Sequence, residues 1–225
     1  MFKFGSIQMR NVAWAMVLGA ICLTLLGHTH RANAFDVDSA RRTVIQDNMA
    51  EMELIKQLQS PDLKVVDSSI KKALDRADSV SPAVLYSMAG ALAKVNRQNE
   101  AVFWYHVGKM RVQFDIMRNR DRSLGDVPTV LAMGLPKPLL QAVYLVGNPD
   151  DMLNITKTAI DWDNSHGHNY NPLWPVPHGL GIFSPGEEGL APESQWQDMN
   201  DSVHTQWLNV MTKAADDIRA IQAKP

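Results

Sequence analysis

Residues 81–120 constrain the fold of this chain more than any other stretch, because they read as two antiparallel helices joined by a short polar turn. Ser81 followed by Pro82 is typical of a helix start, since serine caps the helix and proline fits its first position. The spacing of apolar residues predicts a turn at residues 96–98 and a second helix that begins after Asn99. That second helix is apolar on two sides, so we expect it to lie centrally, covered by other helices.

The same helical spacing of apolar residues continues on both sides of the hairpin. We expect further helices over about residues 38–58, 63–78, 139–146, 148–162 and 193–223. The intervening segment 125–138 is rich in proline and glycine and reads as a loop, within which residues 127–133 could form a short helix. Six or seven helices and no convincing strand predict an all-α protein, built as a helical bundle or a repeat-like array.

The hairpin also resembles a known helical repeat. The matching residues are Leu85, Met88, Ala89 and Leu92 in the first helix, and Ala101, Trp104, Tyr105 and Gly108 in the second. This pattern resembles one unit of a tetratricopeptide or Sel1-like repeat, which implies protein–protein binding. The alternative is an ordinary hairpin with the same packing, because no second copy follows at a period of roughly 34 to 40 residues.

The N-terminus has the layout of a secretory signal peptide. Lys3 and Arg10 precede an uncharged apolar run at residues 12–26, and Ala-Asn-Ala at residues 32–34 is a small-x-small cleavage site. We therefore expect residues 1–34 to be removed. An uncleaved membrane anchor is the rival interpretation, but the apolar run is short for a span, which needs about 20 residues.

The chain that would remain, residues 35–225, has the size of one domain, and we expect a single all-helical one. The removed segment holds three basic residues and no acidic one, so the formal net charge of −2 becomes −5. The only cysteine, Cys22, is removed as well. This acidic balance argues against nucleic acid and anionic membrane surfaces as partners. We expect a periplasmic location with no membrane insertion after cleavage, or secretion as the alternative.

Residues 163–192 combine many prolines and glycines with several aromatic and aliphatic side chains. The prolines exclude a regular helix, whereas disordered linkers lack such apolar residues, so we expect an ordered loop pinned to the helical body. Long loops in compact domains are often functional. The candidate partner-binding residues are Tyr170, Trp174, Phe183, Glu187 and Glu188. For Trp174 and Phe183, stapling the loop to the core is an equal alternative.

Three histidines and an aspartate in this loop suggest a metal site as a second hypothesis. Asp163, His166, His168 and His178 offer imidazole and carboxylate ligands that suit zinc. A polar turn after a helix end is the alternative, since no zinc motif with helical spacing accompanies them. His106 and His204 lie on apolar helices and read as core or edge residues. The basic run Arg118, Arg120 and Arg122 reads as a solvated helix end.

The sequence therefore leads to two functional hypotheses. The first is a periplasmic, non-catalytic protein that binds another protein without a cofactor. Its general appearance is similar to that of immunity proteins, which would make the partner a toxin enzyme. The second is a metal-binding protein or metal-dependent hydrolase that uses the histidine cluster. A binder of small ligands, with a pocket under the loop, is a third possibility. No Gly-x-Ser-x-Gly nucleophile motif is present.

Overall fold

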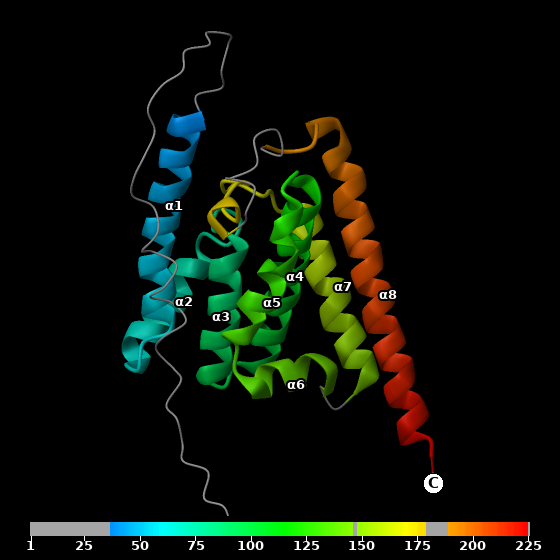
Figure 1. Cartoon of the computed structure of the whole chain (residues 1–225). Helices are drawn as coiled ribbons and strands as arrows, with labels where there is room; N and C mark the ends of the chain where they lie inside the picture. The colour runs from blue at the N-terminus through cyan, green and yellow to red at the C-terminus, as the bar shows by residue number, and fades with distance from the viewer. Residues whose placement is uncertain (1–36, 146–147, 179–188, 225) are drawn as a thin grey trace, which may run out of the picture. The chain divides into compact units, whose positions relative to one another are not determined.

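The structure, a computed structural model, describes residues 37–145, 148–178 and 189–224 (Figure 1). Those ranges contain eight α-helices and no β-strand, which confirms the all-α prediction. The short α5 forms inside the proline- and glycine-rich segment at residues 127–133, where a short helix was named as possible, and it brings the number above the expected six or seven. The expected signal peptide and its cleavage site lie outside the described residues and stay predictions.

The helices follow the order that the apolar periodicity predicts. Their bounds are α1 Val37–Leu58, α2 Leu63–Leu74, α3 Pro82–Lys94, α4 Gln98–Arg118, α5 Val127–Met133, α6 Lys137–Leu145, α7 Pro149–Ser165 and α8 Trp196–Gln222. Short 3-10 helices cover Arg122–Asp126, Val176–His178 and Glu193–Gln195. Helix α2 ends four residues earlier than expected, and the chain turns there toward α3. Within the described ranges, no helix has the length and apolarity to cross a membrane.

The hairpin of α3 and α4 forms the centre of the helical body. Helix α4 packs against α3, α5, α6, α7 and α8 (Figure 1), so its two apolar sides are covered as expected. The turn between α3 and α4 differs in detail from the prediction. Asn96 takes a left-handed conformation, with φ of 63°, and Arg97 rather than Asn99 occupies the N-cap position of α4. Asparagine tolerates this conformation better than most residues.

Two helix starts show how local signals compare with tertiary contacts. Asn148 caps α7 as its sequence suggests, because its side-chain oxygen accepts from the backbone N–H of Asp150 at 2.9 Å. Ser81 occupies the N-cap of α3, but its side chain makes no capping bond. Instead its backbone N–H donates to Oε1 of Glu51 on α1, at 2.7 Å. Burial raises the pKa of Glu51, and this hydrogen bond opposes the increase.

Small residues let α3 and α4 approach closely. A Cβ atom added at Gly108 would lie 3.0 Å from the Tyr86 ring and 3.3 Å from the Leu85 Cβ. A Cβ atom added at Gly90 would meet Leu135 and Pro136 at 3.4 Å, which is an ordinary contact distance. The two helical glycines therefore differ in whether there is room for a side chain.

We expect Gly108→Ala to lower the free energy of unfolding and Gly90→Ala to raise it. Alanine favours the helix over glycine by about 0.5–1 kcal/mol at either site. At Gly108, forcing the buried Tyr86 ring aside costs about 1–3 kcal/mol and outweighs that gain. Urea unfolding of both variants followed by circular dichroism measures the difference. Equal stabilisation by both substitutions would show that the helices do not meet at Gly108.

Candidate functional site

Helix α4 carries three charged side chains on one buried face. Arg111, Asp115 and Arg118 follow one another at spacings of four and three residues, so they lie along one stripe. Their exposed fractions are 0, 0 and 2%. Buried charges are tolerated only where other groups pair with them and satisfy their hydrogen bonds. The groups that pair with these three residues therefore show which parts of the chain the stripe connects.

The first group of partners meets at the carboxylate of Asp163, near the end of α7. One oxygen accepts from Nε of Arg111 at 2.6 Å and lies 3.2 Å from Nε2 of His168. The other oxygen lies 2.9 Å from Nε2 of His204. These contacts join α4, α7, the loop after α7 and α8 at one buried point.

Arg111 also donates hydrogen bonds to three backbone carbonyl groups. Its Nη atoms donate to the carbonyl oxygens of Ala77, His166 and Gly167 at 3.3, 3.4 and 3.3 Å. Its guanidinium lies over the ring of Trp162, 5.1 Å from the centroid. Arginine suits this role because its planar fork presents several donors at fixed angles. The bonds of Arg111 to these carbonyl groups tie the connection between α2 and α3 to the end of α7.

The environment of Asp163 keeps its carboxylate ionised. Burial by itself would raise its pKa, but hydrogen bonds from His168 and His204 and the positive charge of Arg111 outweigh burial. The pKa of Asp163 therefore lies well below its ordinary value. A permanent negative charge at this point compensates the buried charge of Arg111.

The second group of partners meets at Asp115, one turn further along α4. Its carboxylate pairs with Nη2 of Arg118 and accepts from the indole Nε1 of Trp174 at 2.7 Å and the hydroxyl of Tyr170 at 3.1 Å. Burial raises the pKa of Asp115, whereas Arg118 and Trp174 oppose the increase. Burial followed by the charge of Asp115 raises the pKa of Tyr170 well above its ordinary value, so its hydroxyl stays a donor.

The chain returns to the same end of α4 at residues 189–191. The backbone N–H of Ala191 donates to the carbonyl of Arg118 at 2.7 Å, and that of Arg120 donates to the carbonyl of Gly189 at 3.0 Å. Gly189 has a φ of 100°, which side-chain-bearing residues rarely adopt. The Arg118 guanidinium lies over the rings of Phe114 and Trp196, at 4.4 and 4.6 Å. Both ends of the stretch 175–188 are thus fastened to the last turn of α4.

The five residues expected to bind a partner divide between buried and undescribed positions. Tyr170 and Trp174 are 9 and 3% exposed and bond to Asp115, which fits the stapling alternative given for Trp174, and partner binding by these two residues stays a prediction. As they stand, they have little surface to offer a partner. Phe183, Glu187 and Glu188 lie outside the described residues.

The residues of the metal hypothesis do not converge within the part of the chain that the structure describes. Asp163 contacts His168, but the Arg111 guanidinium bonded to the same oxygen would repel a cation. His166 turns away, with its ring stacked on Trp162 and Nδ1 2.8 Å from the Trp162 carbonyl. The side chain of His178 is not described. Among the described residues, no three His, Asp or Glu side chains are placed to hold a metal ion, and the zinc site stays a prediction.

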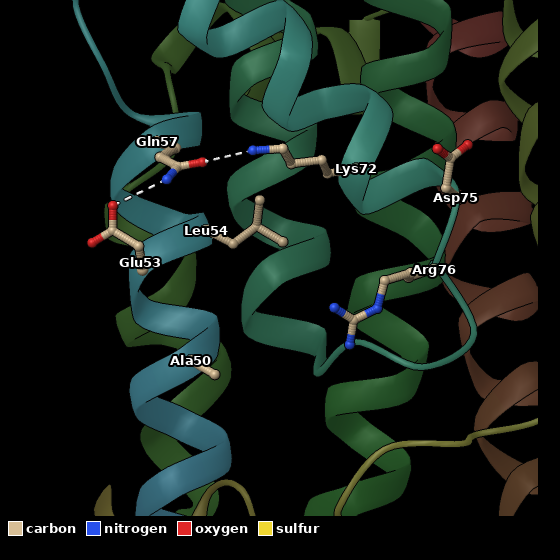
Figure 2. A pocket seen from close by; sticks show the side chains of 7 residues that line it. All are labelled: Ala50, Glu53, Leu54, Gln57, Lys72, Asp75 and Arg76. Atoms are coloured by element: carbon tan, nitrogen blue, oxygen red, sulfur yellow. Dashed lines mark hydrogen bonds between the residues drawn. The ribbon is translucent and has the colours of Figure 1, made fainter.

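A pocket of about 380 Å³ opens between α1 and α2 (Figure 2). Its charged and polar side chains partly satisfy one another, since Gln57 donates to Glu53 at 3.0 Å and accepts from Lys72 at 3.5 Å. The remaining lining residues are Ala50, Leu54, Asp75 and Arg76. None of the residues of the buried network lines this pocket, and it is not the expected pocket under the loop.

Sequence reasoning missed the residues that organise the network, Arg111, Asp115 and Arg118. The interpretation of Arg118 as part of a solvated helix end was wrong, although Arg120 and Arg122 beside it are exposed. A signal was present: all three residues continue the stripe that begins with Trp104 and Gly108. Charged residues on a stripe that must be buried indicate a paired network.

Comparison of the chain with protein-family models, with curated proteins and with solved structures finds no match. The resemblance of residues 81–120 to a tetratricopeptide or Sel1-like unit therefore stays a prediction.

Proposed function

We propose that this is an exported, non-catalytic protein that binds another protein through the stretch 175–188. One observation carries the proposal: the described residues on both sides of this stretch are held at the end of α4, Trp174 by its bond to Asp115 and residues 189–191 by their bonds to Arg118 and Arg120. The bonds that hold these residues involve three buried side chains, those of Asp115, Arg118 and Tyr170.

Fastened ends favour binding for an entropic reason. Ordering a free loop on association costs conformational entropy, and a loop whose ends are already held loses less. Binding segments are often loops positioned by a rigid scaffold. In the sequence, Phe183, Glu187 and Glu188 lie between these two fastening points. These three residues remain the proposed contact residues.

The chemistry of the stretch suggests the kind of partner. Two adjacent acidic residues and an aromatic side chain suit a partner surface with basic groups around an apolar recess. A toxin enzyme whose cleft is blocked by this stretch is one partner of that type. In this respect the protein would act as an immunity protein does.

We expect that replacing residues 179–188 with a glycine–serine linker of equal length abolishes partner binding and leaves the helical body intact. Trp174 and Gly189 stay in place, so both fastening points remain. Circular dichroism checks the fold. Quantitative mass spectrometry of proteins captured from periplasmic extract compares the variant with the unaltered chain.

A matched control is Met133→Ser, which removes a large exposed apolar side chain on α5, 78% exposed, without touching the stretch. It should capture the same proteins as the unaltered chain. The proposal fails if the linker variant keeps its folded spectrum and still captures the same partner in equal amount.

A further inference from the structure

Helix α8 is held to the helical body by two histidine contacts on successive turns. His204 on α8 meets Asp163 on α7, and Trp207 on α8 meets His106 on α4. The other buried residues of α8 are the apolar Val203, Met211 and Ala215. The two histidine contacts differ in where the proton sits, and this difference decides how each responds to acid.

The contact of Trp207 with His106 requires an uncharged imidazole. The indole Nε1–H only donates, and it lies 2.9 Å from Nδ1 of His106. Nδ1 must therefore carry no proton, and the single proton of the neutral ring sits on Nε2. That Nε2 is buried and has no hydrogen-bond partner among the described residues. A second proton could be added only at Nδ1, where it would break the bond to Trp207.

In its contact with Asp163, the His204 ring donates the hydrogen bond, whereas the His106 ring accepts one. An ionised carboxylate only accepts, so Nε2 of His204 must carry a proton. A second proton on this ring would go to Nδ1 and leave the bond in place. The added positive charge would strengthen the bond to Asp163. Acid therefore spares the contact at His204.

We propose that the His106–Trp207 pair makes the attachment of α8 acid-labile. Uptake of a proton by His106 breaks its bond to Trp207 and favours a state in which α8 separates locally from α4, while the bond between His204 and Asp163 persists. Deprotonation restores the bond. No group other than a proton is consumed or released.

The surroundings of His106 offer nothing that would stabilise its charged form. Burial alone lowers its pKa from 6.5 to about 3, and no charged group of another described element contributes. On its own helix, the Tyr105 ring lies 6.0 Å away, and Lys109 is one turn further along. On α8 it meets the uncharged ring of Trp207. A charged His106 is therefore stable only where water reaches it.

The size of the effect follows from the difference in proton binding. When α8 separates, His106 regains its ordinary pKa of 6.5. The opening equilibrium then rises about tenfold for each pH unit below 6.5, until the pH approaches the value of about 3 in the closed state. Between pH 7.5 and 4.5 the expected increase is about 100-fold.

Hydrogen exchange measured by mass spectrometry tests this proposal on the whole chain. Protection factors, corrected for intrinsic exchange rates, are compared at pH 7.5 and 4.5 for peptides of α8 and of α3. We expect the protection of α8 around Trp207 to fall by about 100-fold and that of α3 to fall much less. An equal fall in both helices would overturn local separation, and so would an unchanged α8.

The matched control is His106→Asn, because an asparagine oxygen can accept from the Trp207 indole but takes up no proton. Its α8 protection should be the same at both pH values. If this variant does not fold, His106→Phe fills the site with an apolar ring and should likewise be insensitive to pH. A fall in either folded variant as large as in the unaltered chain would assign the acid response to another group.

Discussion

Replacing Asp163 with alanine should lower the free energy of unfolding by about 3–5 kcal/mol. The loss would come chiefly from Arg111, which is completely buried and would remain without a carboxylate. His168 and His204 would lose their common acceptor as well. Urea denaturation followed by circular dichroism measures this effect at neutral pH, where Asp163 is ionised.

A double-mutant cycle with Arg111→Met identifies the cause. If the cost comes from an unpaired buried charge, the double variant should lose clearly less stability than the two single variants together. The control is Lys213→Ala, which breaks the exposed pair of Lys213 and Asp217 and should change stability by less than about 1 kcal/mol. Strictly additive losses at Arg111 and Asp163 would contradict a coupled pair.

Replacing Asp115 with alanine should expose the loop after α7 to proteases and also destabilise the protein by about 3–5 kcal/mol. The substitution leaves Arg118 buried without its carboxylate, and it removes the acceptor of Trp174 and Tyr170. Limited proteolysis, with cleavage sites mapped by mass spectrometry, should show faster cleavage within residues 166–192 than in the unaltered chain.

Two further variants distinguish the contribution of the bonds to Asp115 from that of weaker contacts of the loop. Asp115→Asn keeps an oxygen that can accept from Trp174 but leaves Arg118 unpaired, so its cleavage rate should lie between those of the other two proteins. Asp47→Ala removes only an exposed hydrogen bond to Asn171, and we expect little change in cleavage. If Asp115→Ala is cleaved no faster than the unaltered chain, the loop is held by other contacts.

Helix positions could be read from the chain because their cause is local. Apolar residues at spacings of three and four, together with proline and asparagine at helix starts, predicted most of the helices. The capping of α7 by Asn148 is an example, since its oxygen bonds a backbone group only two residues away. Gly108, one of the residues that match the repeat pattern, lies where α3 and α4 approach closely.

The sequence did not indicate contacts between groups that are distant in the chain. Arg118 was assigned to solvent because its neighbours in sequence are charged, whereas it lies buried under Trp196. For Trp174 the sequence left partner binding and stapling open, and its acceptor in the structure, Asp115, lies 59 residues earlier in the chain. Ser81 occupies the N-cap position of α3 as predicted, but the sequence did not indicate that Glu51, 30 residues away, accepts its backbone N–H.

The sequence by itself determined that this chain folds as helices and where most of them begin and end, because helical periodicity and capping act within a few residues. Only the tertiary structure decided what the charged stripe of α4 does. Whether Arg111, Asp115 and Arg118 face water or an interior depends on which helices cover them. Asp163, the ionic partner of Arg111, comes from another helix, and Trp174, a loop partner of Asp115, is brought there by the packing of the whole chain.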